Sequence, residues 1–294
     1  MHFLTRYVDV LQALREPSLS ATGGEPGREY HLRFRAEGLA AVAVLTAERL
    51  SALPPGSQSD LVRDVAQPWS AAVATRLFPP HGDSVRALAL ARDIFAAAAG
   101  PLDPALAARA GEAARELAAM FPGPLAAFHV QAFVALSQTL PCFLASAWLA
   151  LLTHSEQMEL LRASPGLMPG AIDELLRYAG PARAQLRRAT RPVQIGGCAI
   201  GIGDYAALML ADANRDPTRF RDPDRLDLFR DAAGHLAFGA GPHACVGAPL
   251  IRAAAGAATA AFVERFSGAR VEFVEWGGGF AIRGPASLRI STCP

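Results

Sequence analysis

The chain has 294 residues, of which 51% are hydrophobic, and it carries a formal net charge of +1 at neutral pH. This length and apolar content suffice for a sizeable core in one or two domains, and the near-neutral charge argues against nucleic-acid binding, which usually needs a strongly basic surface. Its four cysteines, Cys142, Cys198, Cys245 and Cys293, show neither CxxC spacing nor the density of a disulfide framework, so a reducing compartment is expected.

The sequence carries no clear membrane or export signal. Residues 1–6 lack the long apolar core of a signal peptide. The most apolar run, residues 140–152, is shorter than the roughly 20 residues that span a bilayer. We therefore expect a soluble, cytoplasmic protein with no membrane contact.

The first half of the chain is predicted to be helical. Apolar residues at helical spacing predict a helix over residues 7–15, which ends before Pro17. A short glycine-rich loop, residues 21–27, precedes His31 and Arg35, which lie one helical turn apart. Taken alone, such a pair is usually a solvated helix face. Residues 36–120 alternate alanine- and leucine-rich stretches with proline and glycine breaks, and they contain no catalytic motif.

The second half predicts helices and small hairpins. Residues 128–152 form one long apolar helical pattern, and Pro141 inside it predicts a local kink. Residues 193–200 alternate around Gly196 and Gly197, which predicts a β-hairpin. A helix is expected over residues 250–266, followed by a second hairpin around residues 277–279. The chain is therefore expected to be mainly α with small β-hairpins, an α+β fold.

The most informative stretch is the glycine-rich loop from Phe238 to Gly247, followed by an alanine-rich helix. Pro249 suits the first turn of that helix, so Cys245 lies near a helix N-terminus, where free amides and the macrodipole favour a negative sulfur. A thiolate is a soft ligand suited to iron. Glycines let the backbone approach a flat cofactor, with Phe238 packed beside the ring and His243 within reach of a haem propionate.

Two other interpretations of this loop remain. Residues 239–244 fit the dinucleotide fingerprint G-x-G-x-x-A, but that motif needs a preceding strand, and residues 230–235 have the composition of a loop. The simpler alternative is a buried structural cysteine beside a tight turn.

The spacing of this loop resembles the cysteine-ligand loop of the cytochrome P-450 family, F-G-x-G-x-H-x-C-x-G, at every defining position. The resemblance implies a single haem-thiolate domain over residues 1–294 with the cytochrome P-450 fold, haem b as cofactor and Cys245 as the metal ligand. It also implies that Phe238, Gly239, His243 and Gly247 shape the cofactor site.

Three further segments resemble the family's propionate and distal motifs. His31 and Arg35 match its H-x-x-x-R pair, and Arg187 matches its strand arginine; both are expected to contact haem propionates. Residues 135–139 match the distal helix, with Ala135 against the haem and Thr139 retained as a catalytic residue.

The distal motif departs from the family pattern at two positions. Leu136 replaces a glycine, and Gln138 replaces the acid that normally relays protons with the threonine. A neutral amide cannot cycle through a carboxylate, and Leu136 is expected to narrow the space for oxygen and water. Alternatively, residues 137–139 are ordinary polar positions on a buried helix.

The resemblance also predicts structural and substrate-facing residues. Glu174 and Arg177 lie three apart on a helix, commonly a surface pair, but their position matches the family's E-x-x-R helix, with Arg225 closing a buried network. The second hairpin makes Phe280 and Ile282 candidate substrate contacts. Compared with typical members, the N-terminal elements and much of the B–C and F–G lid are missing, so a second copy of the chain is a candidate cover for an open distal face.

The function implied is a monooxygenase-type oxidation of a small or carrier-bound metabolite in a bacterial biosynthetic pathway, with electrons from a ferredoxin or flavodoxin. The changes at Leu136 and Gln138 favour an alternative, non-standard haem-thiolate chemistry: peroxide-driven oxidation, cyclisation, heteroatom bond formation or redox-neutral rearrangement. A third hypothesis is a non-catalytic helper of a partner enzyme, which the intact Cys245 loop disfavours.

Overall fold

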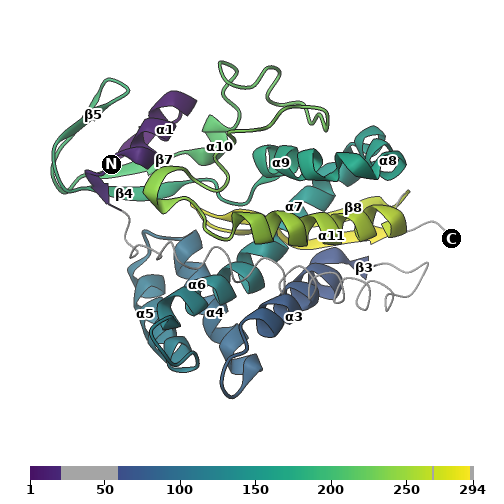
Figure 1. Ribbon diagram of the computed structural model, residues 1–294, viewed down its shortest axis with the longest axis horizontal. Coiled ribbons are helices and arrows are strands. Elements are labelled where there is room, and N and C mark those ends of the chain that lie inside the picture. The colour runs from purple at the N-terminus through teal and green to yellow at the C-terminus, as the bar shows by residue number, and fades with distance from the viewer. Residues whose placement is uncertain (21–58, 267, 292–294) are drawn as a thin grey trace.

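The computed structural model of the chain describes residues 1–20, 59–266 and 268–291. Helices make up most of these residues, and the strands form three small sheets (Figure 1). The predicted mainly α fold with small hairpins is therefore confirmed. The α-helices are α1 (Tyr7–Arg15), α3 (Gln67–Leu77), α4 (Ser84–Ala99), α5 (Pro104–Ala119), α6 (Ala126–Val134), α7 (Leu140–Thr153), α8 (Ser155–Ala163), α9 (Met168–Ala179), α10 (Leu210–Ala213) and α11 (Ala248–Phe266).

Short helical turns of other types link these helices. Two are wider π-helical segments, η2 (Leu61–Ala66) and η3 (Ala135–Thr139), and two are 3₁₀ turns, η4 (Pro165–Leu167) and η5 (Gly241–His243). The strands are β1 (His2–Leu4), β2 (Leu19–Ser20), β3 (Ser59–Asp60), β4 (Gln185–Ala189), β5 (Val193–Ile195), β6 (Cys198–Ile200), β7 (Tyr205–Leu208), β8 (Arg270–Gly278) and β9 (Arg283–Ser291).

The largest sheet brings the N-terminus to the second half of the chain. Its order is β1-β7-β4-β2, with β1 parallel to β7 and β4 antiparallel to both β7 and β2. The predicted hairpins are both present, β5–β6 and β8–β9. Gly196 and Gly197 turn the first with φ values of +59° and +80°, a region that favours glycine.

The long apolar helix is present as α6, η3 and α7 in direct succession. The combined helix Ala126–Thr153 has 28 residues, more than the apolar run identified from the sequence, and by length and composition alone it could cross a membrane. However, 72% of its most apolar window is buried inside the protein. In α7, Trp148 stacks on Phe262 of α11 with ring centroids 4.8 Å apart, so this helix acts as a core helix of the fold.

Two hydrophobic cores meet at the cysteine loop, which we define as residues 236–247. The larger core is built by the helices and by β9, and Phe238 packs against it. The smaller core is formed by α1, the largest sheet and the first hairpin, and it takes in Leu236 and the neighbouring Ala240. The loop therefore lies at the boundary between the two cores, fixed from both sides.

Candidate functional site

The backbone of the cysteine loop is held by its own hydrogen bonds and by α1. The Gly239 N–H donates to the Leu236 carbonyl, and the Cys245 N–H donates to the Phe238 carbonyl, both at 2.9 Å. Gly241 has a φ of +73°, and a Cβ there would lie 2.7 Å from the Leu14 carbonyl oxygen of α1. Glycine is therefore required at position 241, because the loop passes against the helix.

Cys245 is an exposed residue just before α11 begins. Burial raises the pKa of its thiol, while the backbone amides of Gly247 and Ala248 and the charge of Arg252 act to lower it. The amides at the helix terminus therefore favour a negative sulfur, as expected, while burial acts in the opposite direction and gives a net rise in the pKa. The proton is displaced when a metal binds, so the loop suits a metal ligand better than a free nucleophile.

The distal helix widens at the predicted position. In η3 the Leu140 N–H donates to the Ala135 carbonyl five residues earlier, the pattern of a π-turn. Pro141 follows and has no N–H to offer the turn before it, so the predicted local opening is present. Single π-turns in helices occur frequently at functional sites, and Ala135, Gln138 and Thr139 stay partly exposed there.

Leu136 does not face this partly exposed side. Its side chain is 2% exposed and packs in the larger core. The expectation that it narrows the oxygen pocket is therefore wrong, because helical spacing puts it on the face it shares with Phe133 and Leu140. Its neighbour Ser137 is also buried, and the Ser137 Oγ donates to the Phe133 carbonyl at 2.7 Å.

Gln138 is the second departure from the family's distal pattern. Its Nε2 donates to the Ser137 Oγ at 3.4 Å, a long hydrogen bond. Together with Thr139 it provides hydroxyl and amide groups on the partly exposed side of η3, and η3 itself contains no carboxylate. The amide can donate and accept hydrogen bonds but cannot exchange a proton as an acid does.

Arg187 is a buried cation without a carboxylate partner among the described residues. The residue is 7% exposed, and burial lowers the pKa of its guanidinium. Its hydrogen bonds go to the Gln185 Oε1 at 2.7 Å and the Leu186 carbonyl at 3.1 Å. A buried charge needs an opposite charge to offset desolvation, so this site fits an anionic ligand such as a haem carboxylate.

Gln185 joins Arg187 to the cysteine loop. A Cβ on Gly239, which has a φ of +67°, would lie 3.6 Å from the Gln185 Nε2. The arginine and the loop that carries Cys245 are thus linked through one side chain. Sequence analysis missed Gln185, although residues two apart on a strand share a face, which is the signal that could have found it.

The other predicted cofactor residues lie at several places. His31 and Arg35 lie outside the described residues. His243 forms part of η5 and is half-buried, and Gly247 is the turn residue beside the thiol.

The two candidate substrate contacts lie at the tip of the β8–β9 hairpin. The ring of Phe280, 37% exposed, meets Phe3 edge-on at 6.4 Å, so this candidate substrate contact touches β1. Ile282 forms an isolated bridge with Ala182.

The buried charge network is present, but its second arginine differs from the prediction. Glu174 accepts two hydrogen bonds from Arg177, at 2.7 and 2.9 Å, and a third from the Arg230 Nε at 3.1 Å. Arg225 contributes only its backbone carbonyl, which accepts from Arg177 at 3.3 Å, and its side chain is exposed. Residues 221–231 form an irregular loop that turns the Arg230 side chain toward Glu174.

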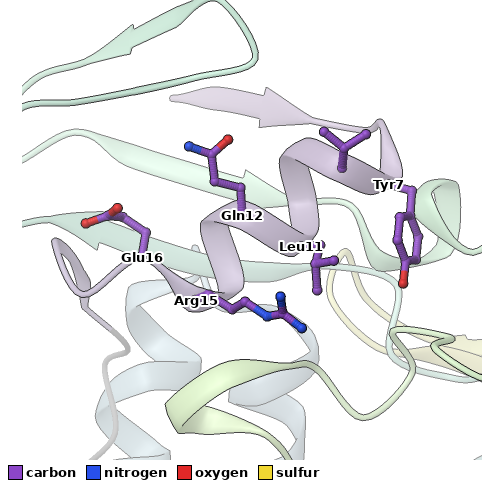
Figure 2. Close-up of a pocket in the computed structure, with 6 residues that line it drawn as sticks. Tyr7, Leu11, Gln12, Arg15 and Glu16 are labelled. Carbon is purple, nitrogen blue, oxygen red and sulfur yellow. The ribbon is translucent and has the colours of Figure 1, made fainter.

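A hollow of about 490 Å³ lies beside α1, lined by Tyr7, Val8, Leu11, Gln12, Arg15 and Glu16. Figure 2 shows the side chains of Tyr7, Leu11, Gln12 and Arg15 projecting from α1, with Glu16 just beyond its end. Arg15 lies against Gly241 of the cysteine loop. None of the predicted site residues that lie in the described part of the chain lines this hollow.

These features fit a haem-thiolate class of protein: an exposed cysteine presented by a glycine-rich loop, and a buried arginine with no carboxylate partner among the described residues. Comparison with known proteins agrees. The sequence model of the cytochrome P-450 family matches residues 153–273. The chain is 30% identical to the LnmA cytochrome P-450 hydroxylase of the leinamycin pathway of Streptomyces atroolivaceus, with a TM-score of 0.76, covering 99% of this chain and 90% of that one. The chain therefore belongs to the cytochrome P-450 family.

Similarity to curated relatives is high but partial. The chain is 47% identical over 133 residues to the cytochrome P-450 monooxygenase PikC of Streptomyces venezuelae, covering 45% of this chain and 32% of PikC. It is 40% identical over 140 residues to 6-deoxyerythronolide B hydroxylase of Saccharopolyspora erythraea, covering 46% and 34%. The matching region thus spans about a third of these relatives. The cytochrome P-450 enzyme CYP109B1 of Bacillus subtilis, 24% identical, shares the fold with a TM-score of 0.85 over 99% of this chain and 93% of that one.

Proposed function

We propose that residues 1–294 form one haem-thiolate unit that binds haem b and carries out a monooxygenase-type oxidation of a small or carrier-bound metabolite. The observation that carries this proposal is the Cys245 loop, in which the cysteine is an exposed residue and the backbone is held by hydrogen bonds. The buried Arg187 supports it independently: no carboxylate pairs with it in the part of the chain that the structure describes, and a haem carboxylate would supply that anion.

Each group has a distinct role in this proposal. When bound through a cysteine thiolate, haem iron supplies cleavage of the oxygen–oxygen bond. Cys245 provides that ligand, and the amides of Gly247 and Ala248 stabilise its negative charge. Arg187 orients the cofactor through a carboxylate, and Gln185 orients Arg187.

The partly exposed side of η3 handles the proton chemistry. The Thr139 hydroxyl can donate a proton or hold a water, while the Gln138 amide positions its neighbours without releasing a proton itself. Small Ala135 leaves room for a flat cofactor.

Absorption spectroscopy tests the proposal. Purified protein is recorded in the ferric form, and again after dithionite reduction under carbon monoxide. The strongly red-shifted Soret band of a thiolate-ligated carbonyl complex is the expected result for the wild type, and C245A should lose that band. C198A is the matched control and should keep it, because Cys198 lies in the β5–β6 hairpin. Protein that takes up no haem, or that shows histidine-type ligation, refutes the enzyme proposal and favours the helper hypothesis.

A second candidate function is favoured by Gln138, which removes the acid from the distal helix. Peroxide-driven oxidation and redox-neutral rearrangement do not require protons to be relayed to reduced dioxygen, so they depend less on that acid. Cyclisation and heteroatom bond formation are further reactions open to this site when an oxidant such as peroxide is supplied. Comparison of turnover with reductant plus dioxygen and with hydrogen peroxide, on the same substrate, separates this chemistry from monooxygenation. Faster turnover with reductant plus dioxygen would count against it.

The relatives and the sequence also indicate the metabolic role and the electron donor. The relatives include PikC, described as a monooxygenase, and 6-deoxyerythronolide B hydroxylase, and they support a role in bacterial secondary metabolism. The chain has no flavin or iron–sulfur motif of its own. We therefore propose a cytoplasmic enzyme that takes electrons from a ferredoxin or flavodoxin, with a second copy as a candidate cover for the distal face.

A further inference from the structure

Three charged or polar side chains from separate elements meet beside Phe238 of the cysteine loop. Asp173 lies on α9, His235 just before the loop, and Arg252 in the second turn of α11. The Arg252 Nε donates to the Asp173 Oδ1 at 2.6 Å, and the His235 Nε2 lies 3.3 Å from the same oxygen. We call these three residues the Asp173 cluster.

A backbone hydrogen bond indicates which tautomer the histidine adopts. The Ala237 N–H donates to the His235 Nδ1 at 3.2 Å, so the ring proton is on Nε2 and is available to Asp173. The Arg252 Nη2 lies 3.4 Å from that Nε2, and both atoms carry hydrogens. Asp173 therefore holds two donors that would otherwise repel each other, and its pKa is lowered because these hydrogen bonds outweigh its burial.

The cluster contacts the ligand loop through Phe238. The Arg252 guanidinium lies over the Phe238 ring, 4.8 Å from its centroid, and the His235 ring centroid is 5.7 Å from that of Phe238. The Phe238 carbonyl accepts the hydrogen bond from the Cys245 N–H. Phe238 thus connects the cluster to the proposed metal ligand, through its ring to Arg252 and through its carbonyl to the Cys245 backbone.

We propose that Arg252, held by Asp173 and His235, is a positioning residue that fixes Phe238 and the Cys245 loop and places a positive charge that sets the reduction potential of the bound iron. This inference rests on the haem-thiolate function proposed above. Reduction adds one electron to the iron, so a fixed cation nearby favours the reduced state, while a nearby anion opposes it. Asp173 and Arg252 therefore act with opposite signs, although they support the same loop.

The test is the one-electron reduction potential of the haem-loaded protein, measured by spectroelectrochemistry on three charge variants. R252Q removes the cation, and we expect the equilibrium constant for reduction to fall about tenfold, a shift of 59 mV to more negative potential. D173N removes the anion and should shift the potential in the positive direction. R265Q removes a charge from the last turn of the same helix and should leave the potential unchanged.

A purely structural role would move R252Q and D173N in the same direction, so equal shifts, or no shift in either variant, overturn the proposal. R252K keeps the charge but loses the flat guanidinium over Phe238, and it should restore most of the potential. If R252Q does not retain haem, the other two variants still decide the question. The proposal then requires a positive shift in D173N and a potential close to wild type in R252K. If the wild type itself lacks the thiolate-carbonyl band, the proposed function has failed; a normal band with unshifted variants refutes only the role of Arg252.

Discussion

The buried network around Glu174 gives a quantitative prediction for R177M. The side chains of Glu174 and Arg177 are both 0% exposed. Arg177 also donates to the carbonyls of Asn214 at 2.9 Å and Pro223 at 2.8 Å. Methionine fills a similar volume but leaves the Glu174 carboxylate with Arg230 as its remaining cationic partner. It also leaves the Asn214 and Pro223 carbonyls without the hydrogen bonds that Arg177 donates to them.

The expected cost follows from the removal of one partner of a buried pair, about 3–5 kcal/mol. Arg162 provides a matched control, because its pair with Glu159 has the same i, i+3 spacing but lies at the surface, with side chains 49% and 50% exposed. Exposed pairs contribute about 0.2–1 kcal/mol. R162M should therefore destabilise the protein by no more than that.

Urea unfolding, followed by far-ultraviolet circular dichroism, measures both changes. We expect the midpoint of R177M to fall well below that of R162M, with similar slopes, since the slope reports the surface exposed on unfolding. If the two variants lose the same stability, the reasoning is refuted: the network would then contribute no more than a surface pair.

Three further predictions follow from the site and its supports. R187M should release haem to apomyoglobin faster than wild type, whereas R188M on the exposed face of the same strand should not; equal rates would contradict the anion-site argument. Burial would raise the pKa of Asp60, but hydrogen bonds led by that from Ser287 lower it overall. The ionised Asp60 therefore stabilises the folded protein at pH values above its unfolded pKa near 3.8. This stabilisation is lost as the pH falls through the lower pKa of the folded state. The stability gap between wild type and D60N should accordingly be widest at neutral pH and close in acid, as urea titrations at several pH values would show. Q138E should raise turnover driven by reductant and dioxygen relative to turnover driven by peroxide; an unchanged ratio would argue against a proton-relay role for this position.

Local patterns in the sequence predicted the elements well. The helix expected over residues 7–15 is α1, and the hairpin expected around Gly196 and Gly197 is β5–β6. Both depend on residues close together in the chain: helical apolar spacing in one, and glycines that turn two alternating runs in the other. The same locality explains why the spacing of the cysteine loop could be interpreted without coordinates.

What the sequence could not predict is the direction in which particular side chains point and how deeply they are buried. Leu136 was placed by its position in a motif, although its spacing from Phe133 and Leu140 indicates the core face. Arg225 and Arg230 lie five apart in an irregular loop, which has no periodicity to show which one turns inward. At Cys245 the expected effect of the amides is present, but the opposing effect of burial on the pKa depends on tertiary packing, which no local pattern gives.

The position of the cysteine loop between two cores has a consequence for folding. Phe238 packs on the larger core, Leu236 belongs to the smaller one, and Gly241 lies against α1. A ligand held by this loop therefore loses binding energy when either core opens, so its binding free energy joins two units that could otherwise exchange amide protons independently. Cofactor binding should turn two local stabilities into one cooperative transition, with slower hydrogen exchange in α1 as well as in α11.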